Sequence, residues 1–157
     1  MNTSDVRELV KNSIVKAVTR YQQDLGALPA EKFAVSPGGE ARSAADFTHE
    51  CALLNRWFAA SLRGDALTRD TPNGWIKAGG DALDLTLATA AFKDSADELL
   101  AAFEALDDAG LDKLVPGYQG PTPAYAWALF AATHIVYHDA QLNYIQSMLG
   151  DDKMHWK

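Results

Sequence analysis

The sequence has a single cysteine, Cys51, among its 157 residues. One cysteine cannot form a disulfide within the chain, so this fold has to be stable without one. A lone cysteine also fits a reducing compartment. A chain of this length buries about 70% of the surface that its unfolded form exposes, which is enough for a hydrophobic core. We therefore expect one domain over residues 1–157.

Long apolar runs and an excess of positive charge are also missing. No run approaches the roughly 18 apolar residues of a membrane span. The N-terminal stretch lacks the unbroken apolar core and the cleavage site of a secretory signal, so we expect a cytoplasmic protein. The chain has 14 Lys and Arg against 21 Asp and Glu, a net charge of −7, and its basic residues are scattered. This balance argues against nucleic acid and against anionic membranes as partners.

No segment alternates apolar and polar residues as a half-buried strand does. Four segments instead repeat apolar residues at spacings of three and four, which predicts helices over about 5–25, 43–63, 81–106 and 122–150. Ser43 and Asp46 form a predicted capping box, and Thr122 is expected to cap the last helix. The pattern predicts an all-α four-helix bundle. The connections over 26–42 and 64–80 are both long enough to cross the bundle, so their lengths leave its topology open.

His134 and His138 lie four residues apart in the last predicted helix, and their side chains therefore share one face. That face also carries Ala131 and Ile145, so the rings are expected to lie at or near the core. A buried imidazole needs partners for both ring nitrogens, and a divalent metal ion can be one of them. The alternative is a pair of hydrogen-bonded core histidines.

His49, near the start of the second predicted helix, is the candidate for a third ligand. A helical wheel places it roughly opposite the apolar stripe of Phe47, Cys51 and Phe58, which counts against that role. By the same wheel Cys51 lies too far around the helix to share a metal with His49, and we expect it to be a small core residue. Glu50 is either a further ligand, a general base or a solvated side chain.

Other polar residues near the histidines are weaker candidates for a role in the site. A carboxylate often orients a ligating histidine, so Asp46 and Asp139 are candidates for that role, although the cap already explains Asp46. Gln141 shares the face of His138, and His155 is expected to lie outside the site. The sequence has no phosphate-binding loop and none of the common hydrolase or di-iron motifs, so it identifies no catalytic residue.

Two segments together resemble a known family. They are "SAADFTHECALLNRWF" and "HIVYHDAQLNYIQSMLGD", and in helix order and histidine spacing they resemble the DinB-like (DinB/YfiT) superfamily. The resemblance implies a bundle with an up-down-down-up arrangement and a homodimer. It also implies a metal triad made of His49, His134 and His138.

The resemblance implies a function as well. The bound ion would be divalent, with zinc or nickel the expected metals, and three imidazoles would leave a position open on it. Characterised relatives include transferases that use a low-molecular-weight thiol such as bacillithiol, mycothiol or glutathione. We therefore expect a metal-dependent thiol S-transferase acting on a small-molecule substrate. The alternatives are a non-enzymatic small-ligand-binding or stress-related protein, and a purely structural bundle.

Overall fold

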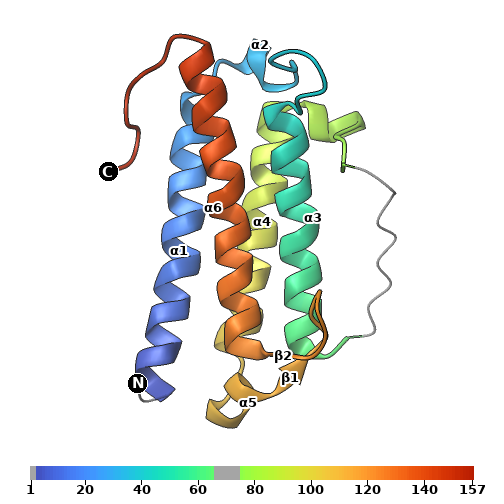
Figure 1. Ribbon diagram of the computed structural model, residues 1–157, viewed down its shortest axis with the longest axis vertical. Helices are drawn as coiled ribbons and strands as arrows, with labels where there is room; N and C mark the ends of the chain where they lie inside the picture. Colours follow the sequence, from blue (N-terminus) through green and yellow to red (C-terminus); the bar gives the residue numbers. More distant parts are fainter. Residues whose placement is uncertain (1–2, 66–74) are drawn as a thin grey trace.

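Four long helices run side by side along the longest axis of the molecule (Figure 1). The structure is a computed structural model, and it describes residues 3–65 and 75–157. The long helices are α1 (Thr3–Ala27), α3 (Ala44–Arg63), α4 (Leu85–Glu104) and α6 (Ala124–Met148). The shorter elements are α2 (Ala30–Phe33), the 3₁₀ helix η1 (Gly80–Leu83), α5 (Asp108–Asp112), and the strands β1 (Leu114–Val115) and β2 (Thr122–Pro123).

Helices α1 and α6 run in one direction, and α3 and α4 run in the other (Figure 1). This is the up-down-down-up arrangement, so the predicted all-α bundle and its topology are confirmed. The predicted connection over 64–80 lies partly outside the described residues, because the description stops at 65 and resumes at 75. None of the described helices is long and apolar enough to cross a membrane.

The start of α3 is fixed by the predicted capping box. The Ser43 hydroxyl accepts a hydrogen bond from the Asp46 backbone N–H at 3.2 Å, and the Asp46 carboxylate accepts one from the Ser43 N–H at 2.9 Å. These two bonds satisfy backbone donors that a helix start leaves unpaired. Asp46 also accepts a hydrogen bond from the Ala78 N–H at 2.8 Å, so one carboxylate ties the segment after residue 74 to the start of α3.

Two predicted helix starts were wrong in detail. The third helix is not continuous from residue 81, because Asp84 accepts a hydrogen bond from the Leu87 N–H and begins α4 only after η1. Thr122 does not cap α6; it belongs to β2, which pairs antiparallel with β1. Strands two residues long give no alternating pattern that a sequence could show. The described chain is nevertheless mainly helical, as expected.

Aromatic side chains fill the middle of the bundle. Tyr21 from α1 and Phe92 from α4 are fully buried, with ring centroids 4.7 Å apart. The Tyr21 hydroxyl forms a 2.9 Å hydrogen bond with the hydroxyl of Thr48 on α3. Three helices therefore meet around these two rings, and the tyrosine hydroxyl keeps a partner although it is buried.

The side chain of Asp24 is buried between α1 and α6. Asp24 accepts hydrogen bonds from Asn143 at 2.7 Å and from the indole N–H of Trp156 at 2.6 Å. Burial, together with the neighbouring Asp24 carboxylate, raises the pKa of Asp139 to about 7. The Trp156 contact holds the C-terminal tail beside the bundle, and the Arg20 guanidinium lies 4.3 Å from the centroid of the same indole.

Replacing Phe92 by alanine should test how much the central packing contributes. The substitution removes a fully buried ring, so we expect a loss of about 3–5 kcal/mol in the free energy of unfolding. Val136→Ala, at a position that is 48% exposed, is the control and should change it by less than about 0.5 kcal/mol. Urea denaturation followed by circular dichroism measures both. An equal loss in the free energy of unfolding for the two variants would contradict the central place of Phe92 in the core.

Candidate metal centre

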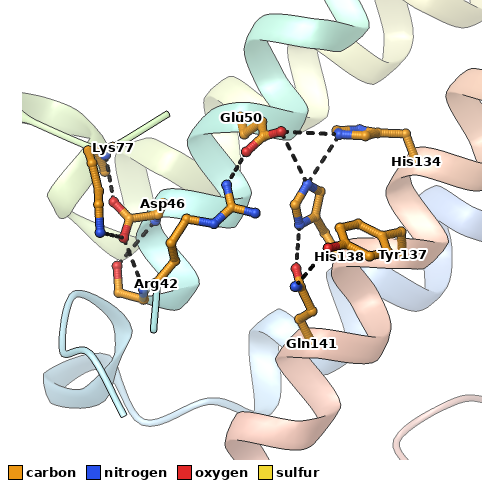
Figure 2. A network of polar contacts seen from close by, with 10 residues as sticks. Arg42, Asp46, Glu50, Lys77, His134, Tyr137, His138 and Gln141 are labelled. Atoms are coloured by element: carbon orange, nitrogen blue, oxygen red, sulfur yellow. Dashed lines mark hydrogen bonds and ion pairs between the residues drawn. The ribbon is translucent and has the colours of Figure 1, made fainter. Parts of the chain in front are cut away.

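The two histidines of α6 point at α3. Their Nε2 atoms lie 3.1 Å apart, and both face the Oε1 atom of Glu50, at 3.5 Å from His134 and 3.6 Å from His138. Figure 2 shows the three side chains converging from the two helices. His138 is fully buried, while His134 and Glu50 are each 13% exposed. The arrangement leaves the cluster close to the surface and shields it from bulk water.

The spacing of these three atoms fits a metal ion. They form a triangle with sides of 3.1, 3.5 and 3.6 Å. Nitrogen and oxygen ligands about 2.0–2.2 Å from one tetrahedral ion lie roughly 3.3–3.6 Å from each other. Two imidazoles and one carboxylate are also a common donor set for divalent transition metals. The side chains could therefore hold an ion with little rearrangement.

Cys51 lies in the same cluster as His134 and His138, although the wheel separated it from a metal site that includes His49. Its sulfur and one nitrogen from each of His134 and His138 all lie within 4.8 Å of one another, so these residues form a group that could hold a metal ion. The wheel placed Cys51 correctly on the buried stripe of α3. The wheel of one helix does not show which side of α3 the histidines face, and α6 packs against the stripe itself.

Neighbouring groups fix the orientation of the His138 ring. Its Nδ1 atom lies 2.8 Å from the amide oxygen of Gln141, whose amide N–H donates to the Tyr137 hydroxyl at 3.2 Å. An amide oxygen only accepts, so Nδ1 of His138 carries the hydrogen and the lone pair of Nε2 faces the cluster. The Phe47 ring stacks on this imidazole at a centroid distance of 5.3 Å. Gln141 thus takes the orienting role considered for Asp46 and Asp139.

Arg42 holds the other side of Glu50. Its Nη1 atom contacts Oε2 of Glu50, and this leaves Oε1 turned towards the histidines (Figure 2). Burial by itself raises the pKa of Glu50. The contacts with His134, His138 and Arg42 together outweigh that effect and bring the pKa of Glu50 well below its ordinary value. Glu50 is therefore a carboxylate at neutral pH, which is the form that binds a cation.

The buried groups around Glu50 favour their neutral forms in the metal-free protein. Burial lowers the pKa of His138, and the nearby Glu50 carboxylate only partly opposes this effect. Burial and the nearby Glu50 charge raise the pKa of the Cys51 thiol well above its usual range. A neutral imidazole can bind a metal directly, whereas a thiol has to lose its proton first. His138 and Glu50 are thus ready ligands, and Cys51 is not.

His49 lies away from this cluster. It borders a separate hollow between α3, η1 and the start of α4, whose other lining residues include Leu53 and Asp81. The position agrees with the wheel, which put His49 on the side of α3 away from the apolar stripe. The structure therefore brings together His134 and His138 of the predicted triad but does not bring His49 to them. His155 lies in the tail, 2.9 Å from Asp151.

Fold and site together define a helical bundle with a histidine, carboxylate and thiol cluster between two of its helices. The family model described as the DinB superfamily matches residues 14–142, and the chain belongs to that superfamily. The predicted resemblance is thereby confirmed. No curated protein matches the sequence.

Two solved structures share the fold. One is a DinB-like protein (YjoA) from Bacillus subtilis, with a TM-score of 0.68 and 12% identity over 94% of this chain and 96% of that chain. The other is a conserved protein from Enterococcus faecalis, with a TM-score of 0.71 and 13% identity over 91% of this chain and 96% of that chain. At such identities the likeness concerns the fold alone.

The pKa of His138 in metal-free protein tests its contact with Glu50, because burial and Glu50 act on that pKa in opposite directions. Because Glu50 opposes the effect of burial, Glu50→Gln should lower the pKa of His138 further below its ordinary value. A titration of the imidazole carbon-bound protons by NMR would follow the shift. An unchanged or higher pKa of His138 in the variant would contradict the contact with Glu50.

Proposed function

We propose that the chain binds one divalent metal ion through His134, His138 and Glu50. The observation that carries the proposal is the triangle of two Nε2 atoms and one Oε1 atom, whose sides lie close to the ligand spacing of a single ion. The hydrogen bond from Nδ1 of His138 to Gln141 supports it, because it turns the lone pair of Nε2 inward. Zinc and nickel both suit this donor set.

The third ligand is the point on which the structure and the family resemblance differ. The resemblance implies His49, and the geometry favours its neighbour Glu50. Cys51 is a further candidate within reach, although its thiol would have to lose a proton in a buried setting. Arg42 supports Glu50 in this role, since its contact with Oε2 keeps Oε1 directed at the histidines.

Metal analysis of purified variants separates Glu50 from His49 as the third ligand. We expect about one ion per chain in the wild type and a loss of bound metal in His134→Ala and His138→Ala. Glu50→Gln should weaken binding by more than the roughly 10–100-fold that follows loss of an outer hydrogen bond. His49→Ala should retain the ion, as should the control His155→Ala. Metal lost from His49→Ala but kept in Glu50→Gln would overturn the choice of Glu50 in favour of the predicted triad.

We propose further that the metal site serves a metal-dependent thiol transferase. A divalent ion with an open position would bind the sulfur of a low-molecular-weight thiol and favour its deprotonated form. The reaction would join that sulfur to an electrophilic carbon of the substrate, with loss of the leaving group from carbon and of the thiol proton to solvent. The side chains would contribute by holding the ion and by shielding it: Phe47 covers His138 on one side.

The second candidate is a non-enzymatic protein that binds a small ligand in the same place. A cavity beside the cluster favours ligand binding under either candidate function. What distinguishes them is whether a thiol reaches the metal and reacts.

A homodimer, implied by the resemblance, stays a prediction; exposed aromatic side chains such as Trp75, which is 67% exposed, are the feature that supports it.

Cobalt-substituted protein tests the thiol step. The background is Cys51→Ala, which removes the chain's only cysteine. We expect added thiol to produce a sulfur-to-cobalt charge-transfer band, because the open position admits the thiolate. The band should be missing in the additional variant His138→Ala. No band and no turnover of model electrophiles with 2-mercaptoethanol, glutathione, bacillithiol and mycothiol would favour the binding protein over the enzyme.

A further inference from the structure

A cavity of about 610 Å³ opens beside the cluster of His134, His138 and Glu50. Its walls come from the loop before α3, from the start of α3, from Trp75 and from the second half of α6. Most of its lining is apolar or aromatic, with Phe47, Tyr144 and Met148 among the residues concerned. A cavity of this size and character is typical of a site for a small organic molecule. Tyr137 and Gln141 line it too, so it adjoins the His138 ring that they orient.

Arg42 is the buried charged group in this cavity wall. Its side chain is only 6% exposed, and its guanidinium lies between two aromatic rings, 5.0 Å from the centroid of Phe47 and 4.6 Å from that of Trp75. Nη1 binds Glu50. Among residues 3–65 and 75–157, no hydrogen-bond acceptor pairs with Nε or Nη2 of Arg42. These two nitrogens form the edge of a guanidinium that binds a carboxylate with two parallel hydrogen bonds.

The surrounding charges permit an anion there. Glu50 neutralises one edge of the guanidinium and would also be engaged by the metal. Lys77 lies close by, but its amine faces Asp46 at 3.8 Å and it does not line the cavity (Figure 2). Glu40 lines the cavity but is exposed to solvent, so its repulsion of an anion is weakened by water and salt. Arg42 is thus the positive group that a ligand in the cavity would meet.

We propose that the cavity binds a small-molecule carboxylate, with its acid group on the Nε and Nη2 edge of Arg42 and its apolar part against Trp75, Tyr144 and Met148. The inference deepens the proposed function, on which it rests: the acid is the substrate or the thiol of the same site. One guanidinium spans the distance from Glu50, the proposed metal ligand, to the cavity. A carboxylate held on its free edge would therefore have its other end within reach of the metal.

A matched pair of ligands tests the charge requirement. The probes are 3-phenylpropanoate and its neutral counterpart 3-phenylpropanamide, titrated by calorimetry into metal-free and cobalt-loaded protein. We expect the acid to bind about tenfold or more tightly than the amide, since hydrogen bonds between charged groups are the stronger ones. Arg42→Gln should abolish the preference. Arg42→Lys should keep only part of it, because an ammonium cannot donate the two parallel bonds.

Lys77→Gln is the control, because it removes a nearby positive charge that does not line the cavity. It should retain the full preference for the acid. Equal binding of acid and amide by the wild type would overturn the inference, and so would a preference that survives in Arg42→Gln. The wild-type comparison and Arg42→Lys keep the test decisive if Arg42→Gln fails to fold. A preference for the acid in protein that binds no cobalt would leave the carboxylate site standing and overturn the metal proposal instead.

Discussion

The packing of α6 against the apolar stripe of α3 is the constraint on which the site depends. This stripe, with Phe47 and Cys51, is the part of α3 that has to leave water, and it meets the face of α6 that carries His134 and His138. Burying that face takes His138 out of solvent completely. A buried imidazole and a buried carboxylate each require partners. The hydrophobic contact thus brings polar groups of both helices together, although Nδ1 of His134 has no hydrogen-bond partner among the described residues.

The network around Glu50 supplies a partner for each of its buried charged groups. Glu50 binds Arg42 through one oxygen and faces both histidines with the other, so its negative charge is shared among three groups. Arg42 in turn is buried between two aromatic rings, where a guanidinium is more easily accommodated than an ammonium. Replacing Arg42 or Glu50 alone would leave the other as a buried charge without this partner, which is the costly outcome for such networks. A divalent ion would compensate the same carboxylate from the histidine side.

The polar cluster and the cavity are built from different kinds of structural element. The histidines come from the middle of α6 and Glu50 from near the start of α3, and packed helices are rigid elements suited to holding an ion. The cavity is built partly from the loop before α3 and from Trp75, segments that a bundle can vary without disturbing its core. Asp46 links the two parts, because the same carboxylate caps α3 and binds the backbone of Ala78. The pocket wall is therefore anchored to the start of the helix that supplies Glu50.

The sequence by itself determined the four helices, the capping box at Ser43 and the pairing of His134 with His138, because these depend on spacing along a single helix. It also placed His49 and Cys51 on the correct sides of α3. Which side of α3 meets α6 is a matter of packing between helices, and a wheel of one helix cannot show it. Only the tertiary structure could therefore bring Cys51 to the histidines and set His49 apart from them. Arg42 had no signal at all in the sequence, since it lies in a loop and gains its role from the rings and the carboxylate that folding places around it.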